Sequence, residues 1–306
     1  MTVKQKGYLS ALIAVFIWSG FILVSRMGGM SELSQYDVIA IRYATCAAML
    51  LPIWWFKYRF SLFNIKLFIA SLVGGLAYAL CTFRGFQLST ASHAALFLPG
   101  LMPLFIILLS VVVNREVQAK SKYLGVGIIT LGVGFMFIDT LSDAQGVSYK
   151  ILQGDGWFIA GSLCWALFSV LIKRWEISPW EVTVSLAFFT CVLYLPVYIL
   201  WLPKALSSAS LTDIALQAVY QGLLATIIQM IFYVKAVQAI GPSSMGVMMA
   251  IVPLVSGVSA IFVFDEAATP TLLLGLLSVS VGAWVAHSHF FKMKFSISNQ
   301  LKNVKS

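Results

Sequence analysis

The segment at residues 101–134, LMPLFIILLSVVVNREVQAKSKYLGVGIITLGVG, returns in related form at residues 251–284, IVPLVSGVSAIFVFDEAATPTLLLGLLSVSVGAW. In both copies an apolar run with an early proline leads to a glutamate and then to a second, glycine-marked apolar run. Four identities keep one offset of 150 residues: Pro103, Glu116, Gly125 and Gly132 correspond to Pro253, Glu266, Gly275 and Gly282. Four ungapped matches in the same order indicate that one sequence module is used twice.

Weaker matches extend the repeat over the rest of the chain. They pair Trp18 and Arg26 with Trp165 and Lys173, Asp37 and Pro52 with Glu181 and Pro196, and Arg84, Gln87 and Ser92 with Lys235, Gln238 and Ser243. We therefore predict a first repeat at residues 1–145 and a second at residues 146–306, the latter including a cytoplasmic tail.

The composition indicates a polytopic membrane protein. Of 306 residues, 60% are hydrophobic and 10% are charged, whereas soluble chains have roughly 45–50% apolar and about 25% charged residues. A soluble fold cannot hide so much apolar surface, and a disordered chain would not contain it. The net charge of +9 has an ordinary source in basic cytoplasmic loops, so we expect no nucleic-acid partner.

Apolar runs predict an all-α protein with ten transmembrane helices in the lipid bilayer. The runs cover residues 8–26, 36–56, 66–84, 93–113, 123–139, 155–173, 180–202, 213–235, 242–264 and 271–289. They are continuous and not alternating, which excludes the pattern of a transmembrane barrel. Because five spans per repeat is an odd number, the second repeat must cross the membrane in the opposite direction, which gives an inverted repeat.

The basic residues predict the orientation. With a cytoplasmic N-terminus, fifteen of the twenty Lys and Arg residues fall on the cytoplasmic side and four on the other. This positive-inside asymmetry predicts that both termini are cytoplasmic. We expect a multi-pass protein of a bacterial-type inner (cytoplasmic) membrane.

Ten spans in two halves resemble the drug/metabolite transporter superfamily, in particular its EamA-type members. The resemblance rests on Ala14-x3-Trp18 and Gly161-x3-Trp165 and on the repeated Pro–Glu–Gly series. It implies a basket of helices in which spans 1, 3, 4, 6, 8 and 9 line a central cavity. Spans 5 and 10 would lie outside as supports or as a homodimer surface, and neither an organic cofactor nor ATP would be needed.

Aromatic and neutral polar residues on these spans are the candidate substrate-binding residues. They are Trp18, Tyr78, Thr82, Phe97, Met102, Trp165, Gln229, Tyr233, Met248 and Met249. Trp18 and Trp165 are the strongest candidates because the repeat pairs them near mid-span. The spans carry no cluster of Lys and Arg, which argues against phosphorylated cargo.

Five further residues are candidates for gating or structural roles. Pro103 and Pro253 lie mid-span and predict kinks in spans 4 and 9, either static or bending during gating. Glu116 and Glu266 lie at span ends, where we expect each to cap a helix end, with a gate latch as the alternative. Arg42, within span 2, is expected to form a structural pair in preference to binding substrate.

The repeated glycines predict close helix packing within the chain, with a dimer contact as the alternative. The four cysteines Cys46, Cys81, Cys164 and Cys191 lie in apolar runs with no metal-ligand spacing, so we expect neither disulfide nor metal site.

These features predict a secondary transporter, and the family resemblance implies the export of a small organic metabolite such as an amino acid or amine by alternating access. A proton, an exchange substrate or facilitated diffusion are all open as the coupling mode. A channel or facilitator for small neutral solutes is the main alternative. We expect no enzyme, because the spans lack clustered catalytic groups.

Overall fold

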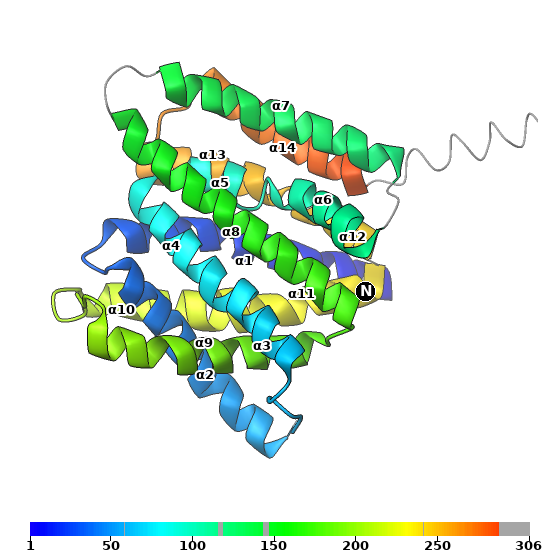
Figure 1. Ribbon diagram of the computed structural model, residues 1–306. Helices are drawn as coiled ribbons and strands as arrows, with labels where there is room; N and C mark the ends of the chain where they lie inside the picture. The colour runs from blue at the N-terminus through cyan, green and yellow to red at the C-terminus, as the bar shows by residue number, and fades with distance from the viewer. Residues whose placement is uncertain (58, 116–118, 143–146, 241, 288–306) are drawn as a thin grey trace, which may run out of the picture.

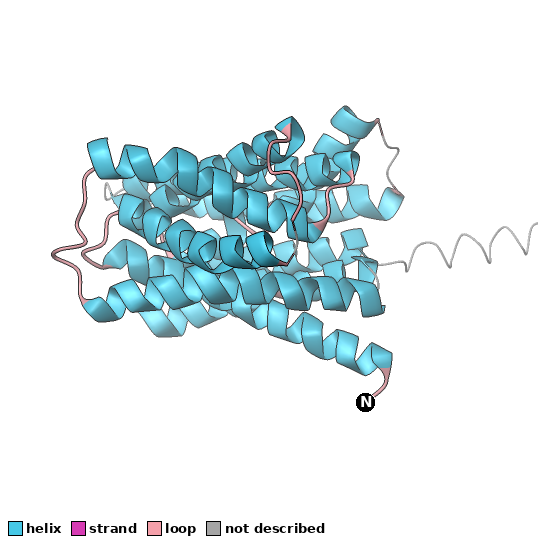
Figure 2. Cartoon of the chain, turned by 90° about the horizontal axis from the view of Figure 1, so that it is seen from below, coloured by secondary structure: helices cyan, strands magenta, loops and turns pink. Residues whose placement is uncertain are grey.

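The computed structural model describes residues 1–57, 59–115, 119–142, 147–240 and 242–287. Throughout these ranges the regular structure is helical (Figure 2). The first half contains α1 (Val3–Met30), α2 (Gln35–Phe56), α3 (Ile65–Ser71), η1 (Leu72–Ala77), α4 (Tyr78–Leu88), α5 (Ala91–Phe97), α6 (Met102–Asn114) and α7 (Lys120–Ser142). The second half contains α8 (Val147–Trp175), α9 (Pro179–Trp201), α10 (Leu211–Gln217), η2 (Ala218–Ile228), α11 (Gln229–Ile240), α12 (Pro242–Met249), α13 (Val252–Phe264) and α14 (Pro270–His287).

Eight helical segments of the described chain are long and apolar enough to cross a membrane. They are Val3–Met30, Gln35–Phe56, Ile65–Leu88, Ala91–Val113, Tyr149–Trp175, Pro179–Trp201, Leu211–Ile240 and Val247–Phe264. Expected spans 5 and 10 correspond to α7 and α14, and the apolar part of α14, Pro270–Ala286, is a shorter helix. The all-helical membrane fold is thus confirmed, while the number of ten crossings stays a prediction.

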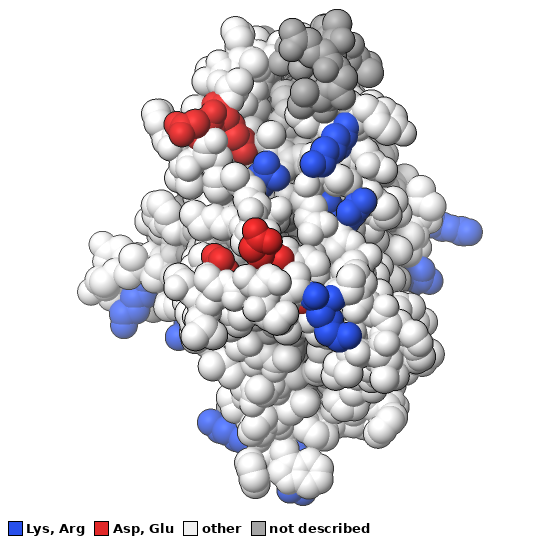
Figure 3. Space-filling view, turned by 90° about the vertical axis from the view of Figure 1, so that its left-hand side faces the viewer, with Lys and Arg blue, Asp and Glu red and all other residues white. Residues whose placement is uncertain are grey.

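The surface agrees with a membrane environment. Phe16, Trp201 and Phe262, on three different helices, expose 62%, 73% and 79% of their area. Figure 3 views the end of the bundle that lies at the left in Figure 1, where groups of acidic side chains have basic side chains nearby. The exposed aromatic side chains of these three helices are stable against lipid hydrocarbon and not against water.

Capping residues fix where α2 and α9 begin. The Ser34 hydroxyl accepts a hydrogen bond from the backbone N–H of Asp37, and the Asp37 carboxylate accepts one from the N–H of Ser34. Ser178 and Glu181 form the same reciprocal pair at the start of α9. Each pair satisfies N–H groups that a helix start leaves open, so the repeat preserves a local folding signal.

Expected spans 4 and 9 are each interrupted before their proline, a sharper change than the predicted kink. α5 ends at Phe97 and α6 starts at Met102, so Pro103 lies in the first turn of α6. Pro253 occupies the same place in α13. A proline in a first turn costs no hydrogen bond, because that N–H has no partner within the helix.

α7 and α14 pack side by side at one edge of the bundle (Figure 1). A Cβ atom on Gly125 would lie 2.4 Å from the carbonyl oxygen of Gly282, and one on Gly132 would lie 3.0 Å from that of Gly275. The order of these contacts makes the two helices antiparallel. The repeated glycines therefore allow close packing within the chain, as the sequence predicted, and the homodimer stays a prediction.

Candidate functional site: a central cavity between the two halves

A small cavity lies between the two halves, with about 40 Å³ of free space. This is room for two or three water molecules. Its walls come from α1, α2, η1, α4, α8, α9, η2 and α11. The lining residues are Trp18, Phe21, Arg42, Tyr43, Gly74, Tyr78, Trp165, Phe168, Val182, Thr183, Leu186, Ala225, Thr226, Gln229 and Met230.

An aromatic cluster centred on Trp165 forms one wall. The Trp165 ring centroid lies 5.9 Å from that of Trp18 in an edge-on arrangement. Tyr78 and Phe168 lie 4.8 Å and 5.1 Å from it. Edge-on and tilted ring pairs at these distances are favourable, and their faces can hold apolar groups or a cation.

Arg42 brings a positive charge to the cavity. It is 7% exposed, and its Nη1 donates to the side-chain oxygen of Gln221 at 3.1 Å. Its guanidinium carbon lies 5.3 Å from the ring centroid of Phe21 and 5.7 Å from that of Tyr43. The hydrogen-bond partner of Arg42 is thus a neutral amide, and the structural role that the sequence favoured stays a prediction.

Two π-helical turns flank the cavity at matching places in the two halves. η1 carries Gly74 and leads into Tyr78, while η2 carries Ala225 and Thr226. π-helical turns are rare and are often found at functional sites. No residue pattern in the sequence indicated them.

Four of the ten predicted binding residues line the cavity: Trp18, Tyr78, Trp165 and Gln229. The other six lie elsewhere: Thr82, Phe97 and Met102 are buried in the protein interior, and Tyr233, Met248 and Met249 pack against a cluster around Ala11 and Ala14. The expected contribution of spans 4 and 9 is not observed, because α5, α6, α12 and α13 provide no lining residue. Spans 2 and 7, as α2 and α9, take their place.

Close helix contacts lie toward both ends of the bundle. A Cβ atom on Gly7 of α1 would lie 2.6 Å from Cβ of Ala239 on α11. A Cβ atom on Gly154 of α8 would lie 2.5 Å from Cβ of Ser89, directly after α4. No side chain fits between these helices while they are in contact.

A buried polar cluster accompanies the Gly154 contact. The Asp155 carboxylate is fully buried and accepts a hydrogen bond from the Ser89 hydroxyl at 2.6 Å. Its other oxygen lies 2.8 Å from Nδ1 of His93. The cluster ties α8 to the α4–α5 connection. Sequence reasoning missed it, because an acidic residue at the start of a span looks like an ordinary interface residue.

Glu266 holds the start of α5. Its carboxylate accepts hydrogen bonds from the backbone N–H groups of Ala91 at 2.7 Å and Ser92 at 2.9 Å, and from the Ser92 hydroxyl. The carboxylate thus caps a helix of the other half, where N–H groups lack partners within the helix. Glu116, its partner in the repeat, lies outside the described residues.

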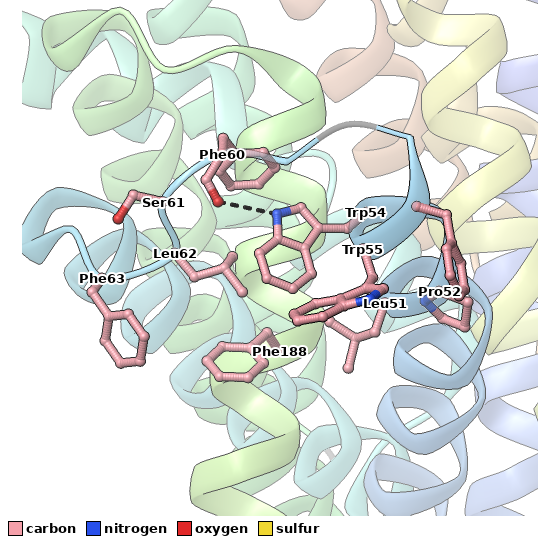
Figure 4. A pocket seen from close by; sticks show the side chains of 10 residues that line it. Leu51, Pro52, Trp54, Trp55, Phe60, Ser61, Leu62, Phe63 and Phe188 are labelled. Atoms are coloured by element: carbon pink, nitrogen blue, oxygen red, sulfur yellow. Dashed lines mark hydrogen bonds between the residues drawn. The ribbon is translucent and has the colours of Figure 1, made fainter.

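A second, larger depression of about 580 Å³ lies on the outer surface at the end of α2 (Figure 4). It is lined by Leu51, Pro52, Trp54, Trp55, Phe56, Phe60, Ser61, Leu62, Phe63 and Phe188. The Trp54 indole donates to the carbonyl oxygen of Phe60 at 3.1 Å. Phe56 and Phe63 are 82% and 90% exposed, as expected of aromatic residues that contact lipid, so we exclude this groove from the candidate site.

Comparisons with known proteins agree with this architecture. The model of the EamA-like transporter family matches residues 5–138 and 152–287. Among solved structures, 28 chains match. One, described only as the crystal structure of a protein, has a TM-score of 0.62 and 18% identity, and the match covers 92% of this chain and 96% of that one. No curated protein matches.

Proposed function

Because the chain belongs to the EamA-like transporter family, we propose that it is a secondary transporter that moves a small organic metabolite across a membrane by alternating access. The substrate class that the sequence favours is an amino acid or amine. The family resemblance implies export from the cytoplasm, and the basic loops favour an inner membrane with both termini cytoplasmic.

The cavity lining supports an inverted repeat of two five-helix halves, 1–145 and 146–306. Many lining residues pair at the offsets that the sequence repeat uses. The pairs are Trp18 with Trp165 and Phe21 with Phe168 at 147, Arg42 with Leu186 at 144, and Gly74 with Ala225 and Tyr78 with Gln229 at 151. A cavity that is built twice from matching positions favours a site on a two-fold axis between the halves.

The packing of α7 and α14 supports the same symmetry. Gly125 contacts Gly282, and Gly132 contacts Gly275, while Gly275 and Gly282 are the repeat partners of Gly125 and Gly132. Such reciprocal contacts, in which position i meets position j and j meets i, are the signature of a two-fold axis. An axis that relates antiparallel helices inverts the second half, which favours ten crossings.

The single observation that carries the proposal is the equivalence of the two end contacts. Gly7 and Gly154 differ by 147 residues. Gly7 lies against Ala239 and Ile240, and Gly154 lies against Leu88 and Ser89, so the contacted residues differ by 151; these are the offsets of spans 1 and 3 in the repeat. A carrier needs one closure on each side and must open them in turn. Both contacts are made in this structure, so transport by this carrier would require each of them to open in turn.

Counterflow in vesicles tests the proposal. We expect purified protein in vesicles preloaded with one amino acid to take up the labelled compound transiently, with saturation. Non-saturating flux of neutral solutes would identify a facilitator or channel instead. An imposed pH gradient distinguishes the coupling modes. It should accelerate solute uptake by proton antiport, whereas the uptake rate of an exchanger should depend only on the solute on the far side of the membrane.

A further inference from the structure

We propose that Arg42 binds the carboxylate of the transported solute, so that the carrier accepts carboxylate-bearing metabolites such as amino acids and rejects the corresponding amines. This inference rests on the proposed transport function and decides between the two substrate classes that it leaves open.

The first argument is the missing counter-ion. Arg42 is 93% buried, being 7% exposed, and its guanidinium forms no ion pair with a carboxylate of the described residues. Its Nε atom is buried without a hydrogen bond. A buried cation in a membrane protein normally pairs with an anion. Arg42 is one of the residues that line the cavity, so a solute that binds when the cavity opens would be in position to supply that anion.

The second argument is that the nearest acidic residue in the sequence is engaged elsewhere. Asp37, one and a half helical turns away on α2, accepts hydrogen bonds from the Tyr198 hydroxyl, the N–H of Ala205 and the N–H of Ser34. These bonds hold the loop after α9 against the start of α2. Asp37 therefore cannot neutralise Arg42 without breaking that contact.

The third argument comes from the other half of the cavity. The repeat places Leu186 where the first half has Arg42, and both residues line the cavity. Since the second half builds the same wall with leucine, the fold does not require a cation at this place. Arg42 makes the cavity electrically asymmetric, which is a property that a solute with a charged end and an apolar end can use.

The aromatic part of the cavity lining fits the rest of an amino acid. The rings of Trp18, Tyr78 and Trp165 offer faces for an apolar side chain or an ammonium group. An amine that lacks the carboxylate would bring a second positive charge into a cavity that already contains Arg42. Like charges in a weakly hydrated site repel strongly, so amines should be rejected.

A paired thermal-shift panel tests the inference. The proteinogenic amino acids and the amines formed from them by decarboxylation are added to the purified full-length protein, since a ligand raises the melting temperature with occupancy. We expect stabilisation by one or more amino acids and by none of the matched amines. The inference would be overturned if an amine stabilised the protein as strongly as its amino acid does. It would also be overturned if no compound of the panel raised the melting temperature.

Variants separate a binding role from a structural one. Arg42→Gln should weaken the best amino acid about 10- to 100-fold and abolish the preference over its amine, with the ligand-free melting temperature unchanged or raised. Arg42→Lys should keep part of the preference, and Arg59→Gln, in the exposed segment that follows α2, serves as the matched control. If Arg42→Gln folds and keeps the full preference for the carboxylate, the proposal is overturned. If Arg42→Gln does not fold, Arg42→Leu replaces it, and the same result in that variant overturns the proposal.

The outcome is distinguishable from failure of the transport function. If an amino acid stabilises the protein through Arg42 but shows no counterflow, the carboxylate site stands and the carrier function fails. If an amine shows saturable counterflow, the carrier function stands and the assignment to Arg42 falls.

Discussion

At the scale of single residues, Trp165 has the most ring contacts in the cavity. It meets Trp18, Tyr78 and Phe168. We expect Trp165→Ala to weaken solute binding at least tenfold and to lower the free energy of unfolding by about 3 kcal/mol, the lower end for buried aromatic residues because this ring is only partly buried. Trp18→Ala, which removes one ring contact, should weaken binding with a smaller loss of stability. Calorimetry of ligand binding and melting curves in detergent measure both, and equal melting temperatures would contradict the central position of Trp165.

Asp155 offers a second test at this scale. Asp155→Asn keeps the size of the side chain but removes the charge that the Ser89 hydroxyl and His93 face. Loss of charge-assisted hydrogen bonds costs about 1.5–3 kcal/mol. We expect the contact between α8 and the α4–α5 connection to loosen, seen as faster hydrogen exchange at residues 88–93. Equal exchange in the two proteins would show that Asp155 does not hold this contact.

Sequence reasoning succeeded at residues that the repeat pairs and failed where only packing decides. Trp18 and Trp165 were found because they match in the two halves and lie mid-span. Phe97 was expected at the cavity and does not belong to its lining, since an aromatic residue on a predicted lining span gives no sign of which way it faces. Phe21 and Phe168 match at the same offset as Trp18 and Trp165, so a residue-by-residue search of the repeat was the signal that could have found them.

At the scale of elements, the glycines of α7 and α14 allow a matched pair of substitutions. A leucine at Gly125 would push against the Gly282 carbonyl oxygen, 2.4 Å from a new Cβ, whereas Gly127 has no atom within 4 Å of that position. We expect Gly125→Leu to destabilise the protein by about 1–3 kcal/mol or more and Gly127→Leu to leave its melting temperature unchanged. A melting temperature lowered equally by both would exclude this packing, and a change of oligomeric mass in Gly127→Leu would support a homodimer through α7.

The helix boundaries show why hydropathy locates a whole span better than it locates a break within that span. A bilayer forces backbone groups into helices, so apolar runs located the helical segments closely. The break between Phe97 and Met102 falls inside one apolar run, where composition is the same on both sides. Pro103 gave the right neighbourhood, but whether a proline bends a helix or starts a new one depends on the packing around it. Every residue of α5 is buried, so the packing around this short helix, and not the sequence of the span, decides where it ends.

At the scale of the whole molecule, the resemblance to EamA-type transporters is confirmed by the family match over both halves. If the second half is inverted, as proposed, equivalent substitutions at the two ends of the bundle must have opposite effects. Gly7 and Gly154 are the natural positions, because each lies against a helix of the other half and neither leaves room for a side chain. In a carrier, a wedge at one end disfavours every state in which that end is closed and shifts the population toward opening there.

We therefore expect Gly154→Leu and Gly7→Leu to open the cavity to opposite compartments. The readout is labelling of a cysteine at Thr226, a lining position, in protein whose four cysteines have been replaced by serine. With a thiol reagent that does not cross the membrane, Gly154→Leu should raise labelling from outside right-side-out vesicles, and Gly7→Leu should raise it in inside-out vesicles. A wedge costing about 1–3 kcal/mol corresponds to roughly a 5- to 150-fold population shift. Labelling raised from the same side by both variants would mean that the two contacts close one entrance, and a scaffold with a single opening would then replace the alternating carrier.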